Sequence, residues 1–506
     1  MRGNGKTKMK SPDIIIIGSG IGGATIASAL AGSGASVLIL ERGEQLPAQP
    51  QARSSKAIFM ESYYRPNEEW LDGQGKRFNP GNYYYIGGNS KFFGAVFFRY
   101  RAEDFAALEH FDGVSPAWPF AYEELEPWYC KAEQLFNVRG PAQGDASEPF
   151  HSQPYSFAPV PDEPDMARHR EKLASAGLNP TSLPLGVDIE RWLKGGQTPW
   201  DAFPDTRSGK MDAESCPLAK ALAAPNVILQ TGAYVETLES SPDGKTITAV
   251  NVMVNGEKRR LTPKIVILSA GAVNSAALLL RSANASFPNG LANSSGQVGR
   301  NFMNHNLMAF LAMHPFEMNR SVYQKTFGMN DFYFSDGKGG KPLGNMQLVG
   351  KIDGNILKAN VKTVPGPILS MMARRSFDYV LTTEDLPNPD SRVRVDGANI
   401  VLDWQRSNMR AMEGLEAAMR ERFRAAGYPI IMTRLFDKRT PSHQCGTVIM
   451  GDDPAKSALD TKCKAWDHDN LYVMDASFLP TSAAVNPALT IAAQALRVGE
   501  RLRRTL

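Results

Sequence analysis

Cysteine is scarce in this sequence. Four cysteines are spread over 506 residues, and no two of them form a CxxC pair. This spacing provides neither a disulfide framework nor the ligand set of a zinc site. We therefore expect a protein that binds no metal and works in a reducing compartment, the cytoplasm.

Long apolar runs and long basic runs are also missing. Segment 1–10 is basic, but the apolar run that follows it, Ile14–Ile17, contains only four residues. That run is too short for the core of a signal peptide or for a membrane span, and no twin-arginine pair stands near the start. The net charge is +4 without a basic cluster, so neither nucleic acid nor a membrane is expected as a partner. Export with a partner protein and assembly into an oligomer both stay open.

Residues 13–43 have the pattern of a strand, a glycine turn, a helix and a second strand. Ile14–Ile17 is a run of isoleucines, as expected for a buried parallel strand. Ala24–Leu30 is predicted to be helical, and Ser36–Leu40 is predicted to form the next strand. The segment therefore predicts one unit of an α/β nucleotide-binding fold.

The turn of this unit has the spacing Gly18-x-Gly20-x-x-Gly23. Glycines at these places permit a tight turn and the close approach of a pyrophosphate to a helix N-terminus. Glu41, at the end of the second strand, can accept hydrogen bonds from the hydroxyls of an adenosine ribose. Its charge disfavours the 2′-phosphate of NADP. The motif alone leaves FAD and NAD open.

The rest of the chain alternates between similar units and less regular segments. Residues 111–205 are rich in proline and aromatics and are interpreted as surface excursions. Residues 307–440 contain alternating runs and one clear helix at about 409–426, which indicates a sheet-based domain. Strands are predicted at Asn226–Gln230 and Ile247–Val254, and another strand, turn and helix at 264–282.

Four blocks resemble the glucose–methanol–choline (GMC) oxidoreductase family of FAD enzymes, and they occur in the family's order. They are GSGIGG with ERG at 18–43, IGGNSKFFGA at 86–95, VILSAGAVNSAALLLRS with VGRNFMNH at 266–305, and HQCGTVIMG with NLYVMDASFLPTSAAVNPALTIAAQALR at 443–497. The last block is the most specific. Segments 111–205 and 307–440 show no specific resemblance.

The resemblance implies an α/β fold with two domains. A discontinuous Rossmann-like FAD domain would comprise residues 11–110, 206–306 and 440–506. A substrate domain with a mainly antiparallel sheet would comprise residues 111–205 and 307–439. The residues implied to contact FAD are Gly18, Ser19, Gly20, Ile21, Gly23, Glu41, Arg42, Gly87, Gly88, Asn89, Ser90, Gly94, Ala95, Val235, Ala270, Gly271, Asp475, Ala476, Pro487 and Ala488.

The resemblance also implies two catalytic residues, His443 and Asn486. Hydride leaves a carbon only as its hydroxyl loses a proton, so a base is needed, and histidine titrates near neutral pH. Asparagine cannot be the base, but it can hold the oxygen by hydrogen bonds. The hydride would pass to flavin N5, and O2 or another acceptor would reoxidise the flavin. His305 is predicted to be structural and His468 to lie on the surface.

One departure from the family concerns the flavin link. Phe92 stands where pyranose oxidases have a histidine bonded to the flavin, so FAD is expected to be non-covalent. Phe93-Gly94 replaces the Asn-Gly of many relatives, which weakens any inference about contacts to flavin N5. Of the four phenylalanines Phe92, Phe93, Phe97 and Phe98, most are expected in the core and one on the wall of the active site.

The expected function is FAD-dependent oxidation of an alcohol to a carbonyl. A sugar, glycoside or other polyhydroxylated substrate is favoured, because pyranose oxidases have the His/Asn pair. Candidate substrate contacts are Trp192, Gln197, Trp200 and Trp404. Alternatives are a sterol-like or aromatic alcohol, since cholesterol oxidases share the pair, and a non-oxidative flavoprotein such as a hydroxynitrile lyase or a photodecarboxylase. An NAD-dependent dehydrogenase fits the four blocks least well.

Overall fold

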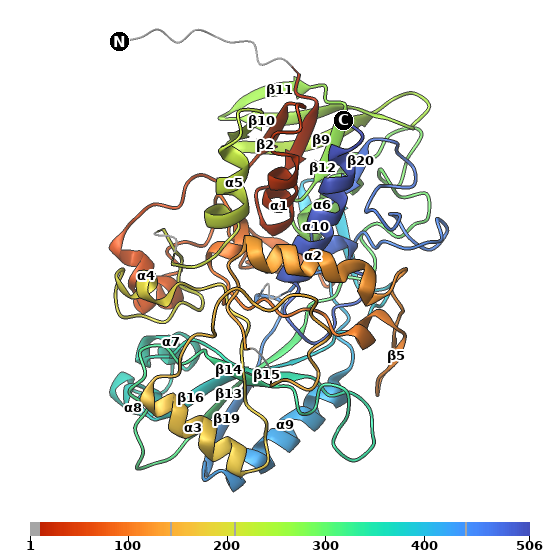
Figure 1. Ribbon diagram of the computed structural model, residues 1–506. Helices are drawn as coiled ribbons and strands as arrows, with labels where there is room; N and C mark the ends of the chain where they lie inside the picture. The colour runs from red at the N-terminus through yellow and green to blue at the C-terminus, as the bar shows by residue number, and fades with distance from the viewer. Residues whose placement is uncertain (1–10, 142–143, 207–208, 441–442) are drawn as a thin grey trace, which may run out of the picture.

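A parallel sheet forms the upper part of the molecule in Figure 1. The computed structural model describes residues 11–141, 144–206, 209–440 and 443–506. The five strands of this sheet lie in the order β20-β12-β1-β2-β8 and all run parallel. Their bounds are β1 Ile14–Ile17, β2 Val37–Leu40, β8 Val227–Gln230, β12 Ile265–Leu268 and β20 Leu471–Val473. All four isoleucines of β1 are buried between its neighbours.

Helices and a small second sheet cover this parallel sheet. Helix α1 packs against α10, the last helix of the chain. The bounds are α1 Ile21–Leu30, α5 Ala219–Leu222, α6 Ala272–Arg281 and α10 Ala488–Arg503. An antiparallel sheet joins β9 Ala233–Ser240, β10 Ile247–Val254 and β11 Glu257–Leu261. The predicted unit at 13–43 and the predicted strand Ile247–Val254 are confirmed.

An antiparallel sheet forms the lower part of the molecule in Figure 1. Its six strands lie in the order β19-β13-β16-β15-β14-β7. They are β7 Thr181–Ser182, β13 Asn306–Met313, β14 Phe327–Met329, β15 Asn345–Leu348, β16 Ser376–Thr383 and β19 Ile430–Leu435. Helices α3 Pro164–Ser175 and α9 Met409–Ala425 lie below it in the view, and α9 packs on β16 and β13. The predicted fold class, a Rossmann-like α/β unit with a second antiparallel sheet, is confirmed.

Several shorter elements lie outside these sheets. One sheet, in the order β17-β18-β3-β4, combines β3 Trp70–Asp72 and β4 Arg77–Phe78 with β17 Arg392–Asp396 and β18 Asn399–Asp403. Other short elements are β5 Leu108–Glu109, β6 Val114–Ser115, α4 Ile189–Leu193, α7 Gly354–Asn360 and α8 Gly366–Ala373. In the described part of the chain, every helix is too short or too polar to span a bilayer.

Helix α2, Tyr122–Leu135, departs from the sequence interpretation. The segment was expected to be an irregular excursion because it contains proline and aromatics. Pro127 lies inside the helix, yet α2 is held by packing against α10. Tyr129 and Thr490 join the two helices through a buried hydrogen bond of 2.8 Å between hydroxyl oxygens. Tertiary packing therefore overrides the local cost of proline here.

Candidate active site

One large cavity lies between the two parts of the molecule. Its volume is about 1110 Å³. Its wall includes the residues that follow β1 and β2 at their carboxyl ends, where nucleotides bind in parallel α/β sheets. The opposite wall is a face of the antiparallel sheet, with Leu307, Gln347 and Thr382 from three neighbouring strands.

Three glycines leave bare backbone on the cavity wall. A Cβ atom added to Gly20 or Gly271 would meet no atom within 4 Å, and one added to Gly88 would meet only the Cα of Gly20 at 3.6 Å. Gly18, by contrast, has φ +104°, and a Cβ there would lie 2.3 Å from the carbonyl oxygen of Ser269. The turn is thus closely packed on the side that faces Ser269 and open on the side that faces the cavity. It therefore admits the close approach of a pyrophosphate.

Two buried carboxylates hold these loops together. Glu41 accepts hydrogen bonds from the Ser19 backbone N at 3.0 Å, the Ser19 hydroxyl at 2.6 Å and the Gly43 backbone N at 2.8 Å. The Ser19 hydroxyl also accepts from the Gly87 backbone N at 3.0 Å, so Ser19 joins the first two glycine loops. Asp475 accepts from the Gly271 backbone N at 3.0 Å. Burial raises the pKa of both carboxyl groups.

His443 faces this cavity beside two polar partners. Its Nδ1 lies 2.7 Å from Nδ1 of His305, and its Nε2 lies 3.2 Å from Nδ2 of Asn486. The backbone of His443 is left-handed, with φ +67°, a strained conformation of the kind often kept at functional sites. Burial, His305 and the cation of Lys325 lower the pKa of His443 well below its ordinary value. The neutral imidazole, which can accept a proton, is therefore favoured.

Comparison with known families identifies the nucleotide part. Residues 13–300, more than half of the chain, match the model of the FAD dependent oxidoreductases. Residues 387–495 match the model of the GMC oxidoreductases. The chain belongs to the FAD-dependent GMC oxidoreductases. The resemblance inferred from the four sequence blocks is confirmed.

Relatives align over almost the whole chain. The 6'''-hydroxyparomomycin C oxidase of Streptomyces lividus is 27% identical over 97% of this chain and 91% of its own length. The fructose dehydrogenase large subunit of Gluconobacter japonicus is 26% identical over 97% of this chain and 98% of its own length. The crystal structure of pyridoxine 4-oxidase from Mesorbium loti superposes with a TM-score of 0.65 at 19% identity, covering 97% of this chain and 99% of that one. That likeness shows the shared fold.

The residues named from the family resemblance gather around the cavity. Every one of them except Gly23 lies on its wall. Gly23 instead faces the backbone, because a Cβ there would lie 2.1 Å from the carbonyl oxygen of Gly18. The open backbone at Gly20, Gly88 and Gly271 fits the FAD that this GMC oxidoreductase requires.

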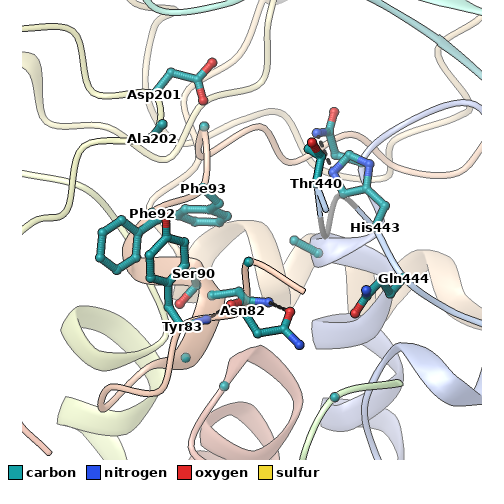
Figure 2. A pocket seen from close by; sticks show the side chains of 18 of the residues that line it. Asn82, Tyr83, Ser90, Phe92, Phe93, Asp201, Ala202, Thr440, His443 and Gln444 are labelled. Atoms are coloured by element: carbon teal, nitrogen blue, oxygen red, sulfur yellow. Dashed lines mark hydrogen bonds between the residues drawn. The ribbon is translucent and has the colours of Figure 1, made fainter. Parts of the chain in front are cut away.

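An aromatic group forms the wall opposite His443 (Figure 2). The rings of Tyr83 and Phe92 are stacked, with their centroids 3.7 Å apart and their planes 11° apart. Phe93 lines the cavity as well, so two of the four phenylalanines lie on the wall where one was expected. Phe97 and Phe98 are buried in the core.

Other sequence interpretations need correction. The candidate substrate contacts Trp192, Gln197, Trp200 and Trp404 all lie off the cavity wall. Trp192 and Trp200 are instead buried, at 0% and 1% exposure. His468, expected on the surface, is 1% exposed; its Nε2 accepts a hydrogen bond from the Ala292 backbone N at 3.1 Å. This histidine supports a buried turn.

Several residues on the cavity wall belong to no sequence motif that could have identified them. Lys325 and Asp201 form an ion pair of 2.7 Å, and a Cβ on Gly94 would lie 2.2 Å from Nζ of Lys325. Gln347 donates from Nε2 to Oδ1 of Asn486 at 3.1 Å. Gln347 reaches the cavity from β15 and Lys325 from the segment just before β14, whereas Asp201 lies outside the strands of this sheet. The alternating pattern of 307–440 predicted a sheet but not which of its faces meets the flavin domain.

Proposed function

We propose that this GMC oxidoreductase oxidises a hydroxyl of a polyhydroxylated small molecule to a carbonyl, with His443 as the base. The observation that carries the proposal is Nε2 of a neutral His443 beside the Asn486 amide on the cavity wall. The names of three relatives refer to 6'''-hydroxyparomomycin C, paromamine and fructose, which favours a sugar-like substrate. Gln347, Thr382 and Lys325 provide polar groups on the same wall.

The proposed roles follow from the charges that develop during oxidation. FAD, when bound, supplies the acceptor for the hydride. Nε2 of His443 takes the proton of the substrate hydroxyl, whose O–H bond breaks as the new N–H bond forms. The Asn486 amide donates to the same oxygen and stabilises its developing negative charge. Gln347 fixes the amide by holding its oxygen.

We also propose that the residues on the open glycine wall hold FAD without a covalent bond. Phe92 supports this view, because its phenyl ring has no atom that can form the histidyl link found in pyranose oxidases. Acid precipitation of the protein should release the flavin into the supernatant. Flavin that stays with the precipitate would contradict this part of the proposal.

The domain division is proposed on the same grounds. Residues 111–205 and 307–439 would form the substrate side, since β13, β15 and β16 contribute their faces to the cavity. Residues 11–110, 206–306 and 440–506 would form the FAD side. The four cysteines are unpaired and buried, which supports a reducing compartment such as the cytoplasm. Cell fractionation would test that location.

The decisive experiment is anaerobic flavin reduction by a panel of sugars, polyols, sterols and aromatic alcohols. His443→Ala should keep FAD bound but slow bleaching by a good substrate about 10²- to 10⁴-fold, the usual contribution of a general base. His314→Ala is the matched control, because His314 lies off the cavity wall. Flavin bleaching at the wild-type rate in His443→Ala would contradict the assignment of His443 as the base.

The panel also separates the alternatives. Bleaching by sterols rather than sugars would favour the apolar alcohol, and a yellow protein that no alcohol bleaches would favour a lyase. Asn486→Asp should slow bleaching more than Asn486→Ala, because a carboxylate opposes the developing alkoxide, whereas alanine only removes a donor. The reverse order would argue against Asn486 as the partner of the substrate oxygen.

A further inference from the structure

A chain of directed hydrogen bonds reaches His443 from behind the cavity wall. It starts at the backbone carbonyl of Ser482, whose oxygen lies 2.8 Å from Nε2 of His305. A carbonyl oxygen can only accept, so Nε2 of His305 carries a proton. His305 is 2% exposed, and burial lowers its pKa. A neutral His305 with a proton on Nε2 has a lone pair on Nδ1.

That lone pair determines the tautomer of His443. The two Nδ1 atoms are 2.7 Å apart, so one of them must donate. Because Nδ1 of His305 has no proton, Nδ1 of His443 is the donor. Neutral imidazole carries only one N–H, and Nε2 of His443 is therefore left with its lone pair.

The partners on the cavity side agree with this assignment. Asn486 places Nδ2, a donor, 3.2 Å from Nε2 of His443, and its Oδ1 accepts from Nε2 of Gln347 at 3.1 Å. A donor facing Nε2 is what an unprotonated nitrogen requires. The hydrogen bonds followed from Ser482 and those followed from Gln347 therefore assign the same tautomer to His443.

We propose that His305 is a positioning residue that fixes the His443 tautomer. Nε2 of His443 then keeps its lone pair on the cavity side, where it accepts from Asn486 in this structure and would accept from the substrate hydroxyl when that group takes the place of the Asn486 N–H. The inference rests on the proposed role of His443 as base. When Nε2 takes the substrate proton, the proton on Nδ1 stays in place and continues to donate to His305. The His443 ring then needs neither to flip nor to move a proton from one ring nitrogen to the other before the reaction.

Two variants at position 305 separate this role from a structural one. Asparagine can place Oδ1 near the position of Nδ1 and accept from His443, but it loses the bond to Ser482. Glutamine can reach Ser482 with its amide N–H, but it leaves His443 without the near acceptor. We expect His305→Asn to reduce flavin at close to the wild-type rate. His305→Gln and His305→Ala should be about 10- to 100-fold slower, the range for a lost orienting partner.

A second readout reports the tautomer itself. In ¹⁵N-histidine NMR of the oxidised holoenzyme, Nε2 of His443 should show no attached proton in the wild type or in His305→Asn. The Gln and Ala variants should show a mixture of tautomers. Flavin content and melting temperature confirm that each variant is folded and loaded.

The inference has clear contrary outcomes. A proton on Nε2 of His443 in the wild type would overturn it, as would a fast Gln variant with a slow Asn variant, which would indicate that His305 only anchors Ser482. Failure of the proposed function is distinguishable, because it would show as fast reduction in His443→Ala, while the NMR result for the tautomer would stand by itself.

Discussion

Gly20 and Gly23 belong to one turn but have different surroundings. Gly20 has φ −68°, which any residue adopts, and its missing Cβ would point into the open cavity. We therefore expect Gly20→Ala to fold normally and to bind FAD weakly, because the methyl group occupies the path of the pyrophosphate. The flavin-to-protein absorbance ratio of the purified variant, with and without added FAD, measures this loss.

Gly23→Ala is the matched comparison. Its Cβ would lie 2.1 Å from the backbone of Gly18, away from the cavity wall, so the fold itself should be destabilised. Its melting temperature should fall even in the absence of FAD, whereas that of Gly20→Ala should not. A fully loaded Gly20→Ala protein would argue against the pyrophosphate position.

At the residue scale, sequence reasoning named residues that line the cavity but not those that lie behind its wall. The glycines, Glu41 and His443 lie in local motifs whose spacing has a physical meaning. His305 was expected to be only structural, because nothing in the sequence shows that it lies 2.7 Å from His443, 138 residues away. Contacts between distant segments depend on packing that local spacing does not encode.

At the scale of elements, α2 depends on a buried ion pair. Arg99 is 0% exposed and meets Glu133 through two hydrogen bonds, Nε to Oε1 and Nη2 to Oε2, each of 2.7 Å. It also contacts Glu126 at 3.2 Å. Arg99→Met should lower the free energy of unfolding by about 3–5 kcal/mol, because Glu133 stays buried without its partner. Urea unfolding followed by fluorescence measures the change.

A substitution on the exposed face of the same helix provides the control. Glu123 is exposed, and Glu123→Gln should change the free energy of unfolding by no more than about 0.5 kcal/mol. Equal effects of the two substitutions would show that Arg99 is not what anchors α2. FAD loading should fall with Arg99→Met, since α2 supports α10, whose first residue, Ala488, lines the cavity.

Elements whose apolar residues recur at a regular spacing were predicted well. Elements that are held by segments far away in the sequence were not. Helix α9 was expected at about 409–426 and extends over Met409–Ala425. Helix α2 was missed because Pro127 is unfavourable in a helix interior. Strand β3 pairs with β18, more than 300 residues further along, and the short strand had no local pattern that predicted this partner.

At the scale of the whole molecule, the site exists only where separate segments meet. The parallel sheet supplies bare backbone at its glycine turns, and the antiparallel sheet supplies polar side chains such as Gln347. His443 and Asn486 come from the segment that returns to the parallel sheet through β20. The order of the blocks predicts a discontinuous domain. The side chains that face the cavity could be identified only in the folded chain, since the four candidate contacts lie off its wall.

The same junction contains an acid that couples folding to pH. Asp104 is buried and accepts at Oδ2 from the Tyr333 hydroxyl at 2.9 Å and from the Arg101 backbone N at 2.7 Å. Tyr333 in turn accepts from the Ala484 backbone N at 3.3 Å, two residues before Asn486 in the chain. Burial and the nearby Glu384 raise the pKa of Asp104 to about 7.

The sign of the effect on stability follows from this raised pKa. Between the ordinary pKa of an aspartate, near 4, and about 7, the folded protein binds the Asp104 proton while the unfolded chain has lost it. The Asp104 contribution to the free energy of unfolding therefore falls as the pH rises through this window, and it is constant above it. The buried histidines His305 and His443, whose pKa values are lowered, act in the opposite direction.

Asp104→Asn isolates the contribution of the acid. The amide oxygen can still accept from Tyr333 and Arg101, but it does not titrate. Measured by urea unfolding, wild type relative to Asp104→Asn should lose about 2–3 kcal/mol between pH 5 and pH 8. Parallel pH profiles for the two proteins would show that Asp104 is ionised at both pH values. In that case the ion would have to be stabilised by Arg101, and Arg101→Gln should then raise the pKa of the carboxyl group.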